Sequence, residues 1–470
     1  MAAKKTKIIA TVGPASMSRR VLEGMRDAGM DAVRINTAHG GFEQYAKIIS
    51  EVRRLEGVPV MLDIKGPEIR VNVSEPVQVR QGELIEAGFS GRSRIRFSHD
   101  FSREVKRGDT LLIDNGKLSF TVKGATRGKV LLSARNSGAI LPHKGVNIPG
   151  RPLKVPSLSA KDLEAIEFAK KHGVEFIALS FTRSREDVLE LKRRIGGSEI
   201  GVIAKIENPQ GVKNIDGIIS ESDGVMVARG DLGVEVGTEK VPLMQKSIIR
   251  KANEEGKIAV TATQMLESMI EQPFPTRAET SDVANAVLDG SDAVMLSGET
   301  AAGKYPVESV KEMAAIAREV EGSVPCNVKT GRARNISSVV SEGIFHASGE
   351  MKLDKIVTIT RSGYTARMIA RYRQRAPIIA VTFSKSVLNQ LALVFGVTPY
   401  FMQDKPRHAL IATTAQFLYR KRAISKTDMV LFTAGILTRR KHASNLIEIH
   451  EASDLLNAKL GHVYPEDEKE

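Results

Sequence analysis

The 470-residue chain has no tryptophan, only 5% aromatic residues and a single cysteine, Cys326. One cysteine cannot form an internal disulfide, which excludes a secreted disulfide-stapled fold and favours a reducing compartment. The scarcity of aromatic side chains argues against stacking surfaces for single-stranded nucleic acid. No apolar run reaches the roughly 18 residues that a transmembrane helix needs. The apolar segment behind the first lysines is also too short for a signal peptide, so we expect a cytoplasmic protein without a membrane partner.

The charge balance is strongly basic, with 69 Lys and Arg against 55 Asp and Glu, a net charge of +14. Such a surplus attracts polyanions, either nucleic acids or small phosphates. The hydrophobic fraction of 42% is ordinary for a soluble globular protein, and the length suggests two to four domains. A nucleic-acid-binding protein is the alternative from another class, but no motif that reads nucleic acid accompanies the charge. We therefore expect no nucleic acid as a partner.

Short apolar runs alternate with amphipathic stretches from residue 6 to about 320. Nearly continuous apolar runs are typical of strands buried on both faces of a parallel sheet. A doubly wound sheet is the alternative, but eight similar strand-then-helix units favour closure into a (β/α)8 TIM barrel. The predicted strands are Ile8–Val12, Ala32–Asn36, Pro59–Ile64, Phe176–Phe181, Gly201–Ile206, Gly224–Ala228, Ile258–Thr263 and Ala293–Ser297. Predicted helices between them include Ala160–Lys171, Arg185–Arg194 and Leu243–Glu255.

One long interruption follows the third strand, over residues 71–155. Its two-residue alternation and its turn signals at Arg107–Asp109 and Asp114–Gly116 predict hairpins of a small inserted β domain. It carries 15 basic and 7 acidic residues, a net charge of +8. This charge fits either a solvated basic appendage or, as we favour, a lid that closes over an anionic ligand at the barrel mouth.

A third region follows a polar linker, Gly322–Arg334. It has strand-like segments separated by helical ones, which predicts an open α/β sheet. The segments are Lys355–Thr360, Ile378–Phe383, Thr398–Met402, Asp428–Ala434 and Leu446–His450. We therefore divide the chain into a catalytic barrel (residues 1–70 and 156–330), the inserted lid (71–155) and a C-terminal α/β regulatory domain (331–470).

Polar residues follow six of the eight predicted barrel strands, where each strand ends. Active sites of such barrels lie at the carboxyl ends of the strands, so we expect these residues to share one rim. The segments are Arg34–Gly40, Asp63–Arg70, Lys205–Asn208, Ala228–Asp231, Thr263–Gln264 and Ser297–Glu299.

Glu207 and Asp231 follow adjacent strands, and two carboxylates suit Mg²⁺ or Mn²⁺ with positions left for substrate and water. Structural ion pairs with rim cations are the alternative. Lys205 stands two residues before Glu207, so both side chains can lean into the mouth. A cation beside a metal is unfavourable without an anion between them, which indicates a bound phosphate, enolate or carboxylate. Backbone N–H groups near Gly230 could hold a carboxylate, although a plain tight turn fits equally well.

Taken together, these segments resemble the pyruvate kinase family. The resemblance is dense over the barrel, includes the insert at Lys144–Gly150 and is looser after residue 330. The matching segments are Lys7–Ser16, Leu62–Arg70, Ile203–Asn208, Met226–Gly233, Ala262–Met269, Pro275–Glu279, Ser281–Gly290 and Val294–Thr300. It implies transfer of phosphate from phosphoenolpyruvate to ADP, giving pyruvate and ATP, as the final step of glycolysis. A magnesium-dependent barrel enzyme acting on enolates, such as a pyruvate aldolase, is the other enzyme considered, but the insert and the nucleotide positions argue against it.

The resemblance also implies a role for each rim residue. Glu207 and Asp231 hold Mg²⁺, and Arg34 binds the phosphoryl group. Lys205 stabilises that group and the enolate, while N–H groups near Arg229, Gly230 and Asp231 take the substrate carboxylate. Thr263 lies where the enolate carbon is protonated. Positions that meet ADP correspond to Asn36, His39, Arg70 and Lys144. The family is usually a homotetramer.

The potassium site of the family is only partly present. The family pattern has a serine at the position of Ala38 and a threonine at the position of Ile64. At position 64 only the backbone carbonyl would coordinate K⁺, so the change of side chain there has no direct effect on the ion. Asn36 and Asp63 are retained, and Glu68 matches the potassium-requiring form. Because these signals conflict, we expect a K⁺ requirement that is weakened or absent.

The loop between the first strand and helix of the third region contains Thr360, Arg361, Ser362, Gly363 and Thr365. Its hydroxyls and N–H groups could hold a phosphate at a helix start, and an ordinary capped helix is the alternative. The family binds phosphorylated allosteric effectors here, so the resemblance implies an effector loop. Thr438–Lys441 departs from effector-binding members, so no particular effector is implied.

Overall fold

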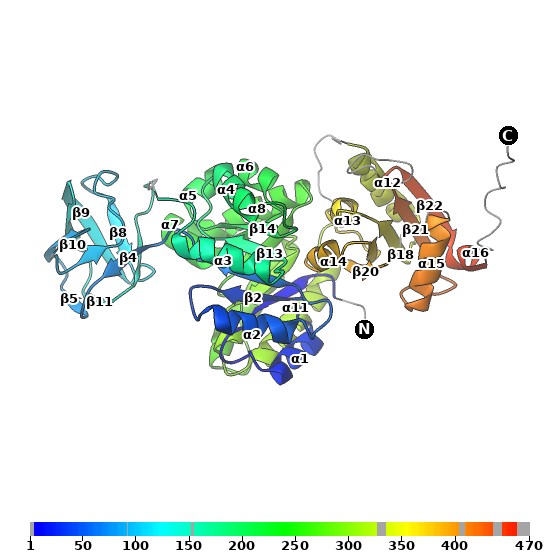
Figure 1. The fold of residues 1–470 in the computed structure, drawn as a ribbon, viewed down its shortest axis with the longest axis horizontal. Helices are drawn as coiled ribbons and strands as arrows, with labels where there is room; N and C mark the ends of the chain where they lie inside the picture. Colours follow the sequence, from blue (N-terminus) through cyan, green and yellow to red (C-terminus); the bar gives the residue numbers. More distant parts are fainter. Residues whose placement is uncertain are drawn as a thin grey trace.

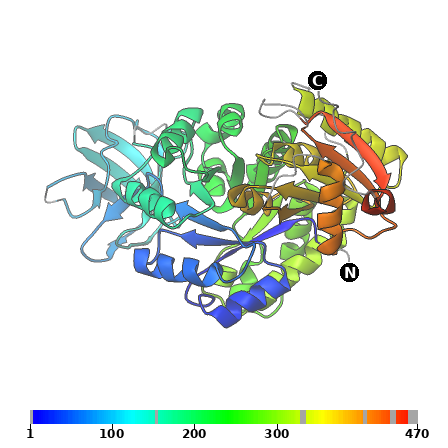
Figure 2. The ribbon, with the colours of Figure 1, turned by 45° about the vertical axis from the view of Figure 1, so that its right-hand side comes forward.

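The computed structural model describes residues 4–91, 93–151, 155–326, 335–403, 409–435 and 444–457. Figures 1 and 2 show a central barrel with the inserted strands at one end and the C-terminal sheet at the other. Among the described residues, no helix has the length and apolar character needed to cross a membrane.

The central barrel is closed by parallel strands in the order β1–β17–β16–β15–β14–β13–β3–β2. Every residue of these strands is buried except Asn36, which explains why their sequences are almost uninterruptedly apolar. The strands are β1 (Lys7–Thr11), β2 (Ala32–Asn36), β3 (Val60–Ile64), β13 (Phe176–Leu179), β14 (Gly201–Ile206), β15 (Gly224–Ala228), β16 (Ile258–Ala262) and β17 (Ala293–Leu296). The predicted TIM barrel is confirmed, and each strand lies within two residues of its expected bounds.

Helices surround this barrel and cover the outward faces of its strands. Their order is α1 (Arg19–Ala28), α2 (Phe42–Val52), α3 (Ala160–Lys171), α4 (Arg185–Ile195), α5 (Pro209–Lys213), α6 (Ile215–Glu221), α7 (Arg229–Val236), α8 (Val241–Glu254), α9 (Arg277–Leu288), α10 (Gly298–Ala301) and α11 (Pro306–Val320). Capping boxes fix where two of them begin, with Ser159 and Asp162 at α3 and Thr276 and Glu279 at α9.

The insert forms a second, smaller closed barrel in the order β10–β6–β7–β4–β12–β8–β9, with β5 and β11 paired beside it. Its strands are β4 (Ile69–Asn72), β5 (Val77–Val79), β6 (Leu84–Gly88), β7 (Arg96–Phe97), β8 (Thr110–Ile113), β9 (Leu118–Thr126), β10 (Lys129–Ala134), β11 (Gly138–Ile140) and β12 (Gly145–Asn147). Asp114–Gly116 forms the expected hairpin between β8 and β9. Arg107–Asp109 instead precedes β8 and does not connect two paired strands. The hairpin predicted at these residues is therefore wrong. The first and last strands, β4 and β12, pair antiparallel where the insert meets the barrel.

The C-terminal sheet has the order β20–β19–β18–β21–β22, with only β22 antiparallel. Its strands are β18 (Lys355–Ile359), β19 (Ile378–Thr382), β20 (Val397–Phe401), β21 (Met429–Ala434) and β22 (Leu446–Glu451). Its helices are α12 (Ile336–Glu350), α13 (Tyr364–Ala370), α14 (Lys385–Leu391), α15 (Leu410–Arg420) and α16 (Ala452–Asn457). Most of the linker predicted at 322–334, and the segment 438–441, lie outside the described residues.

The C-terminal sheet docks on the amino ends of the barrel strands. The Lys7 Nζ at the start of β1 donates to the Val397 carbonyl at 2.9 Å. Asn389 on α14 donates to Glu175, just before β13, at 2.9 Å. The insert leaves from the carboxyl end of β3, so the two attachments use opposite ends of the barrel (Figure 1).

Candidate functional site

Lys205 is the centre of a buried charge network at the carboxyl ends of the barrel strands. Its side chain is 10% exposed, and its Nζ lies 2.9 Å from Glu207 Oε1 and 3.3 Å from Asp63 Oδ1. The Nζ also donates to Ser180 Oγ at 2.8 Å. Burial opposes its charge, but Asp63 and Glu207 outweigh this and raise the pKa of Lys205. The amine is therefore held as a cation at a fixed position, ready to face an anion.

Arg34 joins the same network from β2. Its guanidinium lies 2.7 Å from Asp63 Oδ2 and donates to Thr11 Oγ1 at 3.0 Å. Burial disfavours the charged Asp63 carboxylate, but Lys205 and Arg34 hold its pKa below the ordinary value. One carboxylate thus orients two cations that come from different strands, as the rim prediction requires.

Glu207 and Asp231 are close enough to influence one another electrostatically. Burial raises the pKa of Glu207 to about 7, and the charge of Asp231 adds to this increase. Burial also raises the pKa of Asp231. Glu207 Oε2 accepts a hydrogen bond from the Phe181 N–H at 2.5 Å. Both carboxylates are therefore removed from water, and neighbouring positive charges do not fully balance their negative charges. This condition favours a cation bound between them.

The segment predicted as a loop or tight turn around Gly230 is helix α7, which begins directly after β15. The first N–H groups of a helix have no intrahelical acceptor, so those of Arg229, Gly230 and Asp231 face the end of the barrel. The Gly230 N–H donates to Thr263 Oγ1 at 2.8 Å. The Arg229 guanidinium pairs with Asp282 of α9 at 2.7 Å and also donates to the Thr263 carbonyl at 2.7 Å. The Arg229 guanidinium therefore has a structural partner, while its backbone remains on the rim.

Thr263 lies in backbone strain at the end of β16. Thr263 and the following Gln264 have φ values of +70° and +52°, a region that residues with side chains seldom occupy. The Thr263 hydroxyl donates to the Ala262 carbonyl at 2.6 Å and accepts the Gly230 N–H. Strained non-glycine residues concentrate at functional sites, so this geometry marks Thr263 independently of its sequence motif.

The four residues expected to meet a nucleotide lie in two groups. Asn36 and His39 belong to the segment between β2 and α2, where Asn36 Oδ1 accepts the Ala38 N–H at 3.0 Å and His39 is exposed. Arg70 and Lys144 lie on or beside the paired strands β4 and β12. Arg70 contacts Glu68 at 2.7 Å, and Lys144 contacts Asp114 at 3.1 Å. These ion pairs hold the side chains of Arg70 and Lys144 at the base of the insert.

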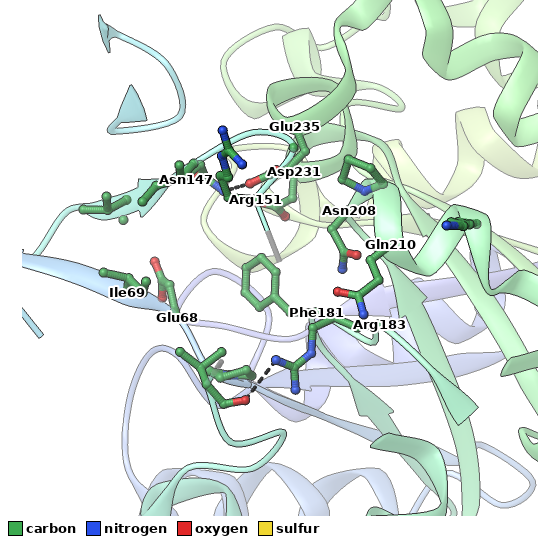
Figure 3. Close-up of a pocket in the computed structure, with 18 of the residues that line it drawn as sticks. Glu68, Ile69, Asn147, Arg151, Phe181, Arg183, Asn208, Gln210, Asp231 and Glu235 are labelled. Carbon is green, nitrogen blue, oxygen red and sulfur yellow. Dashed lines mark hydrogen bonds between the residues drawn. The ribbon is translucent and has the colours of Figure 1, made fainter. Parts of the chain in front are cut away.

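A cavity of about 490 Å³ separates the insert from the barrel. Figure 3 shows Asp231 and Glu235 of α7 beside Asn147 of the insert, with Asn208 and Gln210 across the cavity. Asn147 donates to Glu235 at 2.7 Å, so the insert already touches the barrel rim at this point. The cavity is large enough for a nucleotide-sized ligand.

The residues expected to coordinate K⁺ have other contacts. Asp63 is fully engaged with Arg34 and Lys205, and Ile64 is completely buried on β3. Ala38 offers no side-chain oxygen. Glu68 pairs with Arg70 and with Lys65, whose Nζ lies 3.6 Å away.

The predicted effector loop joins β18 to α13. Thr360 Oγ1 accepts the Gly363 N–H at 3.0 Å, and Gly363 precedes the helix without a side-chain cap. Arg361 and Ser362 are exposed, whereas Thr365 is buried against Ser444 Oγ at 2.6 Å. Only part of the predicted residue set therefore faces outward.

Sequence reasoning missed four residues that hold the site together: Thr11, Ser180, Phe181 and Asp282. Ser180 and Phe181 directly follow β13. The ends of β1 and β13 are the two strand ends from which the sequence analysis chose no rim residue. The same strand-end rule would have found Ser180. Asp282 lies within α9, so no strand-end rule points to it.

Comparison with known proteins gives consistent matches over nearly the whole chain. Family models of the barrel domain and the α/β domain of pyruvate kinase match residues 3–310 and 338–450. The pyruvate kinase of Sporosarcina psychrophila is 40% identical over 96% of this chain and 81% of its own, and that of Clostridium acetobutylicum is 39% identical over 95% and 99%. A solved pyruvate kinase from Cryptosporidium parvum superposes with a TM-score of 0.90 at 35% identity, over 96% of both chains.

Proposed function

Because the chain belongs to the pyruvate kinase family and has that family's phosphotransferase activity, we propose that the buried network around Lys205 carries the reaction. The substrates are phosphoenolpyruvate and ADP, and the products are pyruvate and ATP. The bond between phosphorus and the enol oxygen breaks, and a terminal ADP oxygen forms the new bond to phosphorus. The enolate left behind takes up one proton at carbon. The family assignment decides against the pyruvate aldolase alternative.

The observation that supports these roles is the convergence of Lys205, Arg34, Glu207 and Asp63 within direct contact at the rim. Phosphoryl transfer depends on positioning and charge stabilisation more than on covalent catalysis. Arg34 binds the phosphoryl group, and Lys205 stabilises it and the enolate oxygen. The N–H groups at the start of α7 hold the substrate carboxylate, beside the Gly230 N–H that donates to Thr263 Oγ1. Thr263 hydrogen-bonds at the position from which a proton reaches the enolate carbon.

Glu207 and Asp231 fit a divalent cation, Mg²⁺ or Mn²⁺. The raised pKa of Glu207, about 7, reflects burial and the neighbouring Asp231 charge, both of which a cation would offset. Within the described residues, no group of three His, Cys, Asp or Glu side chains could hold a metal ion. The protein ligands that we propose are therefore two, the carboxylates of Glu207 and Asp231. Mg²⁺ accepts such a pair when substrate oxygens and water complete its shell. When bound, the cation neutralises charge on the phosphoryl and carboxylate oxygens.

Removing the central amine tests the assignment. Lys205→Ala should lower kcat by at least about 10²–10³, the usual cost of losing one oriented charge contact to the transition state. The measurement is a coupled assay of pyruvate formation with and without Mg²⁺, with circular dichroism to verify the fold. Lys171→Ala, an exposed change at the end of α3, is the control. Near-normal turnover of Lys205→Ala would remove the basis for the assigned roles.

We also propose a weak or absent requirement for K⁺. Ala38 lacks the side-chain oxygen of the family pattern, and the Asp63 carboxylate already serves two cations. We expect similar turnover in K⁺, Na⁺ and choline at fixed ionic strength. Strong activation by K⁺ over the other two would contradict this prediction.

Two further proposals concern assembly and regulation. Exposed apolar side chains gather at the edge of the C-terminal sheet, with Ile447 and Ile449 on β22 and Ile336 and Val339 on α12. The barrel separately exposes Leu243, which is 75% exposed. The apolar side chains at the sheet edge suit one of the interfaces of a homotetramer. A phosphorylated effector at the loop 360–365 stays a prediction, supported by the exposure of Arg361 and Ser362.

A further inference from the structure

Glu299, which follows the last barrel strand β17, is a buried carboxylate that has no role in the reaction as assigned above. It lies in the short helix α10 and is only 2% exposed. In the ranges of the chain that the structure describes, no lysine, arginine or histidine forms an ion pair with it. Burying a charged carboxylate without a cation is costly, so its contacts need an explanation.

Both oxygens of Glu299 accept hydrogen bonds from backbone N–H groups. Oε2 accepts from Ser297 at 2.7 Å, a local bond at the start of α10. Oε1 accepts from Leu266 at 3.1 Å, and Leu266 belongs to the segment that follows the neighbouring strand β16. The carboxylate therefore joins the ends of two barrel strands. The residue that it holds is three positions after Thr263.

A second charged group, the Arg229 guanidinium, holds the other end of the same segment. It donates to the Thr263 carbonyl at 2.7 Å and to the Gln264 carbonyl at 3.1 Å. Thr263 and Gln264 are the two consecutive residues with positive φ, and such strain persists only where the surroundings fix the backbone. A cation thus binds the carbonyls of the strained residues, and an anion binds the N–H of Leu266 that follows them.

We propose that Glu299 is a positioning residue for Thr263. By fixing the Leu266 N–H, its carboxylate keeps the Thr263 hydroxyl at the place from which a proton reaches the enolate carbon. Glu299 touches no substrate and acts through the backbone between the two residues. This inference rests on the proposed role of Thr263. Misplacing a reacting group by about 1 Å can cost about 10²-fold in rate, so the loss of this contact should be measurable in the protonation step.

Deuterium exchange into the methyl group of pyruvate, followed by NMR in D₂O with Mg²⁺ and ATP, measures the proton transfer separately. Glu299→Gln replaces one acceptor oxygen by an amide group, so one of the two N–H groups loses its partner. We expect exchange at least about tenfold slower than in the wild type, with an unchanged KM for phosphoenolpyruvate. Glu267→Gln removes the same charge from the exposed residue beside Leu266 and should exchange at the wild-type rate. Wild-type exchange by Glu299→Gln would overturn the proposal.

A double-mutant cycle distinguishes positioning from a purely structural role such as fixing the start of α10. If Glu299 acts through Thr263, Glu299→Gln should slow exchange little further in the Thr263→Ala background. Equal slowing in both backgrounds would contradict the proposal and leave the role of Thr263 intact. Normal exchange by Thr263→Ala would reject that role and this inference with it.

A second variant covers the case in which Glu299→Gln does not fold, as judged by circular dichroism. Glu299→Asp keeps the charge but shortens the side chain by one carbon, which withdraws the carboxylate from Leu266. It should also slow exchange, and wild-type exchange by this folded variant would overturn the proposal.

Discussion

At the scale of single residues, Ser180 decides how Lys205 is presented. Its hydroxyl accepts from Lys205 Nζ at 2.8 Å and donates to Asp63 Oδ1 at 3.2 Å. Ser180 therefore touches both the amine and the carboxylate that orients Arg34. A hydroxyl in this position limits the freedom of the lysine side chain without taking part in bond making.

Ser180→Ala should lower kcat about tenfold while the fold is retained, because a hydrogen bond to a charged group is worth about 1.5–3 kcal/mol. Steady-state kinetics on both substrates give the measurement. Ser220→Ala removes an exposed hydroxyl that bonds only to a carbonyl of its own helix α6 and serves as the control. Equal activity of the two variants would show that Ser180 does not position the lysine.

The strand-end rule was sufficient to predict Lys205, Glu207 and Arg34 from the sequence because their positions follow from the barrel itself. Their side-chain partners could not be predicted in the same way. Thr11 and Ser180 are common residue types whose importance depends on which strands become neighbours. The strain at Thr263 is likewise visible only in the folded backbone.

At the scale of elements, helix α9 shows how a capping carboxylate connects two segments. Glu279 accepts from the Thr276 N–H at 2.8 Å within the capping box. It also accepts from the Ser268 N–H at 2.7 Å and thereby ties the helix to the segment after β16. Burial opposes ionisation, but the hydrogen bonds from Ser268 and Thr276 hold the pKa of Glu279 below its ordinary value.

A carboxyl whose pKa is lower in the folded state stabilises the fold above its unfolded pKa and loses that contribution as pH falls through the folded pKa. Glu279→Gln should therefore cost about 1 kcal/mol at pH 7, and the difference from wild type should shrink below about pH 4. Urea unfolding at several pH values measures this. Glu164→Gln, exposed on α3, is the control. A constant difference from pH 7 to pH 3 would contradict the assignment.

Helix α7 shows the limit of prediction at this scale. Gly230 and Gly233 reduce intrinsic helix propensity, so the local sequence indicated a turn. Leu232 and Gly233 are buried in the folded protein, and tertiary packing overrides the local preference. The more regular α3 was predicted with its observed bounds because its cap and periodicity agree.

At the scale of the whole molecule, the eight repeated strand-then-helix units were sufficient to predict the closed central barrel. The closure of the insert into a barrel of its own was not predicted. The insert's topology depends on pairings between distant strands, such as β4 with β12. Local alternation cannot specify them. The mixed C-terminal sheet was predicted in outline, with its five strands at the expected places.

The edge of that sheet gives a prediction about assembly. Ile449 on β22 is 38% exposed, and an exposed edge strand offers unpaired backbone groups to a second chain. Ile449→Lys should convert the proposed tetramer into dimers, measured by light scattering after gel filtration. Leu84→Lys, which changes an exposed residue of the insert, should leave the mass unchanged. A tetrameric mass for Ile449→Lys would exclude this edge as an interface.

The paired β4 and β12 have a mechanical consequence. The insert joins the barrel where Ile69 pairs with Val146 and Arg70 with Gly145. Both strands are also inner strands of the insert's closed barrel, because β4 pairs with β7 and β12 pairs with β8. The residues at the base of the insert therefore move with its barrel as one body. Each approach should bring Arg70 and Lys144 toward the barrel in the same orientation.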